Sequence, residues 1–451
     1  MSFMNFLRKN VFDPLYCHYT RSPRRSYWRE LEKSQFLTEK ELQDRQQEKL
    51  KRLVEFAGKE NAFYSQRFEK AGFSTGRPWT LDDFKRIPVL TKKEIRENSA
   101  RMISNGYDID RLMHFKTGGS TGKSLDIYIT EECSELRNAC ARRHDRWTGW
   151  EVGEPIAAVW GNPQLPTTLK ERIKDTLLGP VIYLDTMCVN NASVTAFVRE
   201  WEAVKPTLLF GHAHSIFLLA RYLRQLKIEH LRPKGILSTS MMLLPHERQY
   251  IEDVFQVKVT DRYGCEEVSL IGCECEEHQG MHLNTDHLFV EFLNEDGTAS
   301  GVGEAGNLVI TDLINYAMPF VRYRVEDVGV PSGRKCSCGR GFPLMEQVVG
   351  RIADFLVKPD GSRVAGISLI ENTLTKYKGL DQMQIVQTSY EEFIIRVVPG
   401  NGFNNDIKED LSVFMKEIFG SNIKVNYEVL TSILPEESGK YRFTVCKVIN
   451  E

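Results

Sequence analysis

Apolar residues recur along the chain in two rhythms, one typical of helices and one typical of strands. Between residues 27 and 72 they follow one another at spacings of three and four amid charged residues, which predicts helices. Between residues 155 and 263 short apolar runs alternate with helical stretches, which indicates parallel βαβ units. We expect strands at 155–161, 181–184, 207–211, 235–240 and 257–263, and helices at 168–178, 191–203, 214–227 and 245–255.

The rhythm changes after residue 286. Residues 288–293 read as a strand, and Asn294-Glu295-Asp296-Gly297 is a hairpin-type turn signal. From about residue 352 the chain reads as a separate small α+β unit. The further strands are expected at 306–313, 319–325, 382–389, 392–398, 423–429 and 442–449, with helices at 367–377 and 404–419. The predicted fold class is α/β, with a large domain at 1–350 that holds βαβ and hairpin parts and a small α+β domain at 351–451.

A loop rich in glycine and hydroxyl residues lies between two expected strands. Residues 117–124 read Thr-Gly-Gly-Ser-Thr-Gly-Lys-Ser, with strands expected at 112–115 and 125–129. Glycines let the backbone approach a phosphate chain, while N–H groups, hydroxyls and a lysine donate hydrogen bonds to it. The spacing excludes a Walker A motif, because Thr117 stands where that motif needs its first glycine. Taken alone, the loop fits a simple turn as well as a phosphate site.

Threonines mark the starts of two shorter helices in the N-terminal part. Thr80 is expected to cap residues 81–84, and Thr91 is expected to cap Lys92 to Asn98. A longer helix is expected at 131–148.

Composition bounds the class of protein. The chain has 451 residues, 41% of them hydrophobic and 27% charged, with a net charge of −2, which is ordinary for a globular protein. The net charge gives no reason to expect nucleic acid or an anionic membrane as a partner. No apolar run approaches the ~18 residues that span a bilayer, and the N-terminus lacks a signal-peptide core. We therefore expect a cytoplasmic protein without an integral membrane segment, whose first residues dock as a helix, with a short amphipathic membrane contact as the alternative.

Four of the ten cysteines form two Cys-x-Cys pairs, Cys273 with Cys275 and Cys336 with Cys338. In a cytosolic chain such pairs suggest a metal before a disulfide. Cys275, His282, Cys336 and Cys338 would complete a closed tetrahedral structural zinc site. Cys273 and His278 are competing ligands, and free thiols are the alternative to a metal.

Five elements in a fixed order resemble the motifs of the adenylate-forming superfamily. They are the loop at 117–123, Tyr263-Gly264-Cys265-Glu266-Glu267, Tyr323-Arg324-Val325-Glu326-Asp327, Gly350-Arg351-Ile352-Ala353-Asp354 and Pro435-Glu436-Glu437-Ser438-Gly439-Lys440. The stretches 87–92, 318–324 and 336–340 resemble the phenylacetate–CoA ligase branch, which includes relatives found with capsule genes. Ala353 departs from the acid usual at the hinge, and Ser124 departs from the proline common after the loop.

The resemblance implies an ATP- and Mg²⁺-dependent ligase that joins a carboxylate to AMP and then forms an acyl-CoA, with a small domain that rotates between the two steps. It implies that Lys440 and Glu267 are catalytic, Lys440 on the carboxylate and α-phosphate oxygens and Glu267 on Mg²⁺. Tyr263 would pack against adenine, and Asp327 would accept from the ribose hydroxyls. The alternatives are a surface carboxylate at Glu267 and a simple turn aspartate at Asp327. The expected nucleotide-binding residues are Thr117, Gly118, Gly119, Ser120, Thr121, Gly122, Lys123, Ser240, Tyr263, Gly264, Glu266, Asp327 and Arg351.

Two other functions stay open. One is acyl transfer from the adenylate to an amine or hydroxyl acceptor in surface-polysaccharide biosynthesis. The other is a zinc-binding nucleic-acid module, which the net charge and the lack of interleaved basic and aromatic residues disfavour. The expected partners are a small carboxylic acid and CoA or another acyl acceptor, and a homodimer stays open. The acid itself is not readable; Trp147, Trp160, His212, His214, Ser240 and Met241 are candidate pocket residues because most stand near strand ends.

Overall fold

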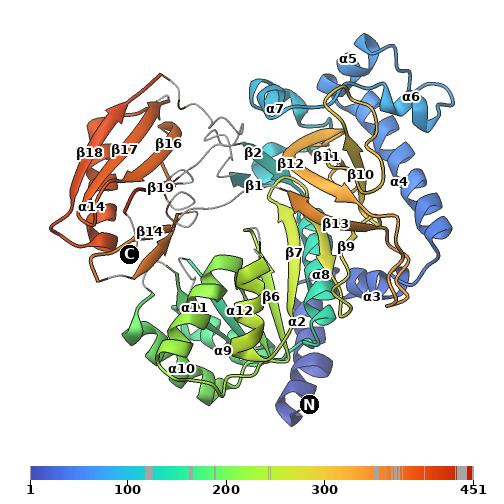
Figure 1. Ribbon diagram of the computed structural model, residues 1–451. Coiled ribbons are helices and arrows are strands. Elements are labelled where there is room, and N and C mark those ends of the chain that lie inside the picture. The colour runs from blue at the N-terminus through green and yellow to red at the C-terminus, as the bar shows by residue number, and fades with distance from the viewer. Residues whose placement is uncertain are drawn as a thin grey trace. The chain divides into compact units, whose positions relative to one another are not determined.

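A computed structural model of the chain shows two compact units of helices and sheets (Figure 1). It describes residues 2–116, 125–161, 166–186, 189–241, 243, 245–349, 355–360, 362–366, 369, 373, 376–377, 379–400, 402–431, 433 and 444–448. The first unit comprises residues 1–115, 126–152 and 260–350, and the second comprises 116–125, 153–259 and 351–451. The domain boundary at residue 350 stays a prediction.

Helices form the N-terminal part of the first unit, as the apolar spacing predicts. The capping boxes of α6 and α7 confirm the expected helix starts. The Thr80 and Thr91 hydroxyls accept hydrogen bonds from the backbone N–H groups of Asp83 and Glu94, and the carboxylates of Asp83 and Glu94 accept from the backbone N–H groups of the two threonines. The elements are α1 (Phe3–Leu7), the π-helix η1 (Arg8–Phe12), α2 (Asp13–Tyr19), α3 (Arg24–Ser34), α4 (Glu39–Glu60), α5 (Ala62–Lys70), α6 (Leu81–Lys85), α7 (Lys92–Asn98), η2 (Ser99–Met102), η3 (Ile109–Arg111) and α8 (Glu131–Trp147).

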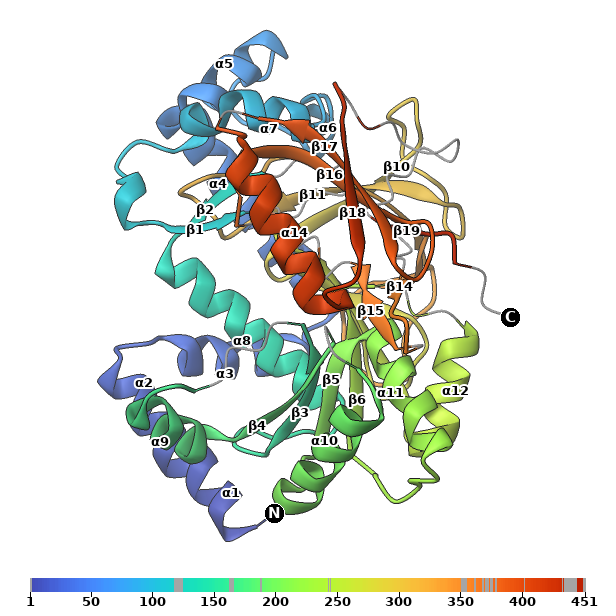
Figure 2. The ribbon, with the colours of Figure 1, turned by 90° about the vertical axis from the view of Figure 1, so that its left-hand side faces the viewer.

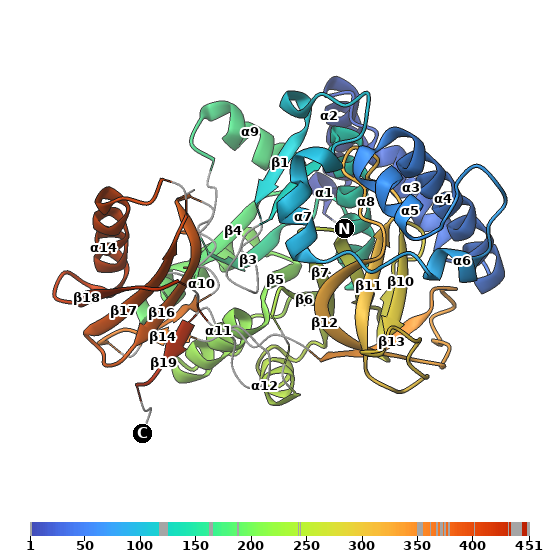
Figure 3. The ribbon, with the colours of Figure 1, turned by 90° about the horizontal axis from the view of Figure 1, so that it is seen from above.

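Strands of the first unit pair antiparallel, with helices α3 to α6 beside them (Figure 3). Their spatial order is β10 (Leu288–Leu293), β11 (Gly306–Asp312), β12 (Tyr323–Pro331), β13 (Leu344–Val349), β9 (Met281–Leu283), β8 (Ser269–Glu274) and β7 (Val259–Cys265). The β10–β11 pair confirms the predicted hairpin. A separate pair, β1 (Met113–Lys116) and β2 (Asp126–Ile129), confirms the strands expected on either side of the glycine-rich loop.

The second unit contains the predicted parallel βαβ series. Its strands lie in the order β4 (Val181–Asp185), β3 (Ile156–Trp160), β5 (Leu208–His212) and β6 (Gly235–Thr239). The connecting helices are α9 (Leu169–Leu178), α10 (Asn191–Val204), α11 (Ala213–Gln225) and α12 (Pro245–Phe255). Phe197, Leu219 and Phe255 from three of these helices share one buried core with the strands.

The C-terminal residues of the second unit form the expected α+β arrangement. Helix α14 (Asn405–Phe419) packs on a sheet ordered β18 (Lys424–Val429), β17 (Glu392–Pro399), β16 (Leu380–Gln387) and β19 (Thr444–Cys446), as Figure 2 shows. Strands β14 (Phe355–Val357) and β15 (Arg363–Ala365) pair separately. Much of the helix expected at 367–377 lies outside the described residues. Across the parts of the chain that the structure describes, no helix is both long and apolar enough to cross a bilayer.

A buried ionic network ties α8 to the segment before β10. Arg143 is fully buried and donates to Asp286 Oδ2 at 2.5 Å and to Asn284 Oδ1 at 2.8 Å. His287 Nδ1 lies 2.9 Å from the other oxygen of Asp286. Burial alone would raise the pKa of Asp286, but Arg143 and His287 outweigh it and hold that pKa well below its usual range.

We expect Asp286→Asn to lower the free energy of unfolding by about 3–5 kcal/mol, because it leaves the Arg143 guanidinium buried without its counter-ion. Urea titration at neutral pH measures this, with exposed Asp44→Asn on α4 as the control. A depressed folded-state pKa stabilises the fold above the unfolded pKa of about 4, and that stability is lost as the pH falls through the folded value. The difference between wild type and Asp286→Asn should therefore shrink in acid; a neutral-pH loss no larger than that of Asp44→Asn would contradict the prediction.

Candidate functional site

Glu267 occupies a buried corner in the tight turn between β7 and β8. Its side chain is 5% exposed, which rules out the alternative of a surface carboxylate. Tyr323 donates its hydroxyl to Glu267 Oε1 at 2.9 Å, and Arg137 Nη2 donates to the Glu267 backbone oxygen at 3.0 Å. Gly264 makes the turn possible, because a Cβ there would lie 2.6 Å from the Ser269 oxygen.

Tyr263 and Asp327 meet beside the same corner. Tyr263 on β7 donates its hydroxyl to Asp327 Oδ2 on β12 at 2.7 Å. Asp327 is 6% exposed, so it is a buried strand residue and not a simple turn aspartate. The structure thus brings together three side chains that the sequence singles out from two separate motifs, the carboxylates of Glu267 and Asp327 and the phenol of Tyr263.

Tyr323 is a site residue that the sequence motif contains without indicating its role. Burial raises the pKa of its phenol well above the usual range, and the adjacent Glu267 carboxylate raises it further. The phenol is therefore protonated near neutral pH and donates steadily to Glu267. Its place at the first position of the Tyr-Arg-x-x-Asp element is the signal that could have identified it.

Lys92 is a second residue whose role the sequence does not reveal. Its Nζ lies 3.9 Å from Glu267 Oε1 and 3.0 Å from Glu326 Oε2. The backbone places it there, since Leu90 N donates to Arg322 O at 2.7 Å and Arg324 N donates to Leu90 O at 2.9 Å. The stretch 87–92 is therefore joined to β12, the strand that carries Tyr323 and Asp327.

The structure describes only some of the remaining predicted site residues. The loop at 117–123, Arg351 and Lys440 lie outside the described residues, so their roles stay predictions. Ser240 stands at the end of β6 in the second unit and has a left-handed φ of 66°. Glu266 immediately precedes Glu267 in the β7–β8 turn.

Three of the candidate acyl-pocket residues, Trp147, Trp160 and His212, pack against neighbouring side chains. Trp160 and His212, at the ends of β3 and β5 in the second unit, have ring centroids 3.9 Å apart. Trp147, in the first unit, donates its indole N–H to Gln35 Oε1 at 2.9 Å and lies under the Arg340 guanidinium. Neither arrangement identifies an acyl group.

Cys275, His282, Cys336 and Cys338 gather their ligand atoms within 4.8 Å of one another, so the four predicted metal ligands form one cluster in the first unit. Cys275 Sγ lies 3.6 Å from Cys336 Sγ, and Cys338 Sγ lies 3.3 Å from His282 Nε2. Two sulfurs bound to one tetrahedral zinc at ~2.3 Å lie about 3.8 Å apart, so the spacing fits that ion.

The chemistry of the cluster also fits a metal. Burial raises the pKa of the Cys275 and Cys336 thiols in the absence of a metal, whereas backbone N–H groups of Glu277 and Arg340, each 3.5 Å from the sulfurs of Cys275 and Cys338, would stabilise thiolates bound to an ion. Burial and the nearby Arg340 charge lower the pKa of His282 to about 4, so its imidazole is neutral near pH 7 and offers a lone pair.

The two competing ligands lie outside the cluster. His278 Nδ1 faces Glu274 Oε2 at 3.5 Å. Cys273 is buried on β8, and its sulfur is not among the four clustered ligand atoms. The positions of the side chains therefore favour Cys275, His282, Cys336 and Cys338 over the two competitors, and the ligand set stays a prediction.

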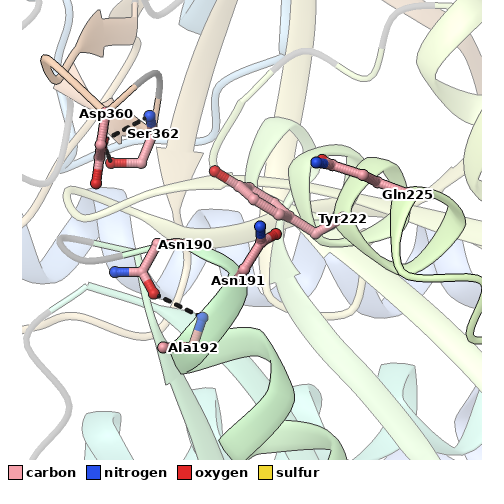
Figure 4. A pocket seen from close by; sticks show the side chains of 7 residues that line it. All are labelled: Asn190, Asn191, Ala192, Tyr222, Gln225, Asp360 and Ser362. Carbon is pink, nitrogen blue, oxygen red and sulfur yellow. Dashed lines mark hydrogen bonds between the residues drawn. The ribbon is translucent and has the colours of Figure 1, made fainter.

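The second unit also contains a hollow whose lining includes none of the predicted site residues that the structure describes (Figure 4). It is lined by Asn190, Asn191, Ala192, Tyr222, Gln225, Asp360 and Ser362. The described residues of this lining offer amide and hydroxyl groups and one carboxylate but no cation, and such a set does not suit a phosphate.

Comparisons with known proteins agree with the motifs. Residues 356–447 match the family model of the CapK C-terminal domain. The protein CapK of Staphylococcus aureus is 23% identical over 412 residues, which cover 89% of this chain and 88% of the relative. The phenylacetate-coenzyme A ligase of Thermus thermophilus is 26% identical over 335 residues, 71% of this chain and 73% of the relative.

A solved structure has the same fold. It is 2-hydroxyisobutyryl-CoA ligase in complex with 2-HIB-AMP and CoA in the thioesterification state, with a TM-score of 0.60 and 20% identity over 92% of this chain and 91% of that chain. The likeness confirms the mixed α/β fold with a large multi-strand sheet and a smaller C-terminal α+β region. The chain is thus similar in sequence to CapK and to phenylacetate-coenzyme A ligases, and similar in fold to a CoA ligase, as its motifs predict.

Proposed function

We propose that the chain is an ATP-dependent carboxylate-activating ligase that forms an acyl-adenylate and then an acyl-CoA. The observation that carries the proposal is that the Tyr263–Glu267 and Tyr323–Asp327 motifs meet through two hydrogen bonds, from Tyr263 to Asp327 and from Tyr323 to Glu267. The likeness to phenylacetate-coenzyme A ligases and to a CoA ligase that binds an acyl-AMP supports it.

The chemistry requires two anions to meet, so the site must neutralise charge and hold both reactants in place. Asp327 would accept from the ribose hydroxyls, and Tyr263 would pack against the adenine. The loop at 117–123 would hold the β- and γ-phosphates, and Arg351 would lie over the nucleotide. The buried carboxylate of Glu267 suits Mg²⁺, a hard cation that would offset the phosphate charge.

We assign the Cys275, His282, Cys336 and Cys338 cluster to a structural zinc ion. With three thiolates and one imidazole the four-coordinate shell is closed, so the ion would have no open position for a substrate. It would join the segment after β8 to the loop before β13.

A panel of carboxylic acids tests the proposed function. Purified protein is given ATP, Mg²⁺ and one acid at a time, and exchange of labelled pyrophosphate into ATP is scored first without and then with CoA. We expect one chemical class of acid to drive exchange and a thioester to form once CoA is present. No exchange with any acid would count against the whole assignment.

The match to CapK over most of the chain favours a second candidate, an adenylating enzyme that passes its acyl group to an amine or hydroxyl of a polysaccharide precursor. The same panel separates the two candidates, because the second would show exchange but no thioester after CoA is added. Amino sugars and sugar hydroxyls would then be tried as acceptors.

Lys440→Ala is expected to lower carboxylate-dependent exchange by about 10²-fold, because it removes a cation from oxygens that gain charge in the transition state. Thioester formation from a synthetic acyl-adenylate and CoA should change much less. Lys424→Ala, on an exposed strand edge of the same α+β region, serves as the control. Unchanged exchange in Lys440→Ala would remove the lysine from the mechanism.

A further inference from the structure

Lys92 holds a positive charge inside the first unit. Its side chain is 2% exposed, and burying an ammonium group is costly unless carboxylates compensate it. Among the residues that the structure describes, the carboxylates of Glu326, at 3.0 Å, and Glu267, at 3.9 Å, lie close to it. The cation is therefore shared between two acids and lies closer to Glu326.

Backbone contacts fix the positions of both Lys92 and Glu326. Lys92 is the first residue of α7, directly after the Thr91 cap and the Leu90 bonds to β12. Glu326 lies where the β11–β12 register is irregular and has a left-handed φ of 70°, a conformation uncommon for a residue with a side chain. An unusual backbone at such a place commonly serves a site.

A second cation stands one helical turn further along α7. Arg96 interacts electrostatically with Glu326 and with Tyr323, the residue that donates to Glu267. Glu326 is therefore paired with Lys92 and also interacts with the Arg96 charge, while Glu267 accepts from the Tyr323 phenol and lies near Lys92. The negative charge left on Glu267 depends on how firmly Glu326 holds Lys92.

We propose that Lys92 is a positioning residue that competes with the divalent cation for Glu267, and that Glu326 sets the strength of this competition by drawing Lys92 away. The inference rests on the proposed role of Glu267 as a Mg²⁺ ligand. A cation 3.9 Å from a ligand oxygen repels an arriving metal ion, whereas a cation held on Glu326 leaves that oxygen available.

The inference predicts opposite effects for two neighbouring substitutions. Lys92→Met removes the competitor, so the half-saturating metal concentration should fall by about tenfold. Glu326→Gln releases Lys92 onto Glu267, so the same concentration should rise by about tenfold. A merely structural role for this ion pair would weaken metal binding in both variants.

Metal binding is measured directly with Mn²⁺, which shares the oxygen preference of Mg²⁺. The full-length protein is titrated with Mn²⁺ at a fixed concentration of a non-hydrolysable ATP analogue, and electron paramagnetic resonance measures the concentration of free Mn²⁺. The nucleotide's own Mn²⁺ binding is then equal in every sample. Lys93→Met, an exposed neighbour on α7, is the matched control and should titrate as the wild type does.

Two further variants keep the outcome decisive. Lys92→Arg retains the charge, and its half-saturating Mn²⁺ concentration should stay within about threefold of the wild-type value. If Lys92→Met fails to fold, Glu326→Gln still provides the test, because the Glu326 side chain is one-third exposed and tolerates substitution more easily. The inference would be overturned if the half-saturating Mn²⁺ concentration shifted in the same direction in Lys92→Met and Glu326→Gln, or if it shifted in neither variant. Glu267→Gln separates the failure of the Lys92 inference from the failure of the proposed function. If Glu267→Gln leaves Mn²⁺ binding unchanged, the proposed metal role of Glu267 fails as well.

Discussion

Glu267→Gln is expected to lower carboxylate-dependent exchange of pyrophosphate into ATP by about 10²–10³-fold. Glutamine has nearly the same shape as glutamate, and its amide oxygen can still accept the Tyr323 hydroxyl bond. Lys92 keeps Glu326 as a counter-ion at 3.0 Å, so the buried cation is not left alone. The substitution thus removes one negative charge from the proposed metal site while the surrounding contacts remain.

The urea midpoint of Glu267→Gln should stay close to that of the wild type, which separates a lost charge from a lost fold. Glu295→Gln, in the exposed β10–β11 turn, removes the same charge away from the site and should leave exchange unchanged. Raising the Mg²⁺ concentration should restore part of the Glu267→Gln activity. Full activity at ordinary Mg²⁺ would show that another group holds the ion.

The parts of the fold that the sequence predicts are those with strong local patterns. Apolar spacing predicts α3 to α5, and the threonine caps predict where α6 and α7 begin. Strands β8, β9 and β13 are not predicted; β9 has only three residues, and β13 pairs on one side with a strand that is distant in sequence. Residues Leu344 and Met345 of β13, for example, pair with His282 and Met281 of β9.

The strand expected at 319–325 shows why an apolar run can mislead. Its first residues are buried but form no ladder, because the Tyr64 hydroxyl donates to Pro319 O and accepts from Val321 N. Strand β12 begins only at Tyr323 and continues to Pro331. A side chain far back in the sequence supplies the bonds that a neighbouring strand would otherwise make.

The site divides in the same way. Motif residues such as Glu267 and Asp327 can be named from the sequence because their spacing carries the signal. Lys92 and Arg137 reach Glu267 from α7 and α8, and nothing local in the sequence states those contacts. Only the tertiary bonds of Leu90 to β12 bring the Lys92 charge to the carboxylate.

Purified protein is expected to contain about one zinc ion per chain, and Cys336→Ser to lower that content well below one. The reason is the closeness of the four ligand atoms, with Cys275 Sγ and Cys336 Sγ only 3.6 Å apart. Without a metal, thiols at this distance contribute little, whereas a bound zinc ion joins two loops and stabilises them as folding free energy. The melting temperature of Cys336→Ser should therefore fall by at least about 5 °C.

Elemental analysis and thermal unfolding of the same samples test this prediction together. Cys446→Ser, a half-buried thiol in the second unit, is the matched control and should keep the full zinc content. Cys273→Ser tests the choice of ligand, because a loss of zinc there would place that thiol in the shell. Removing zinc with a chelator should lower the melting temperature of the wild type and leave Cys336→Ser almost unaffected, since that variant has already lost the ion. Protein that is free of metal yet melts as the untreated wild type does would refute the site, and the four residues would then be free thiols and an imidazole that pack without an ion.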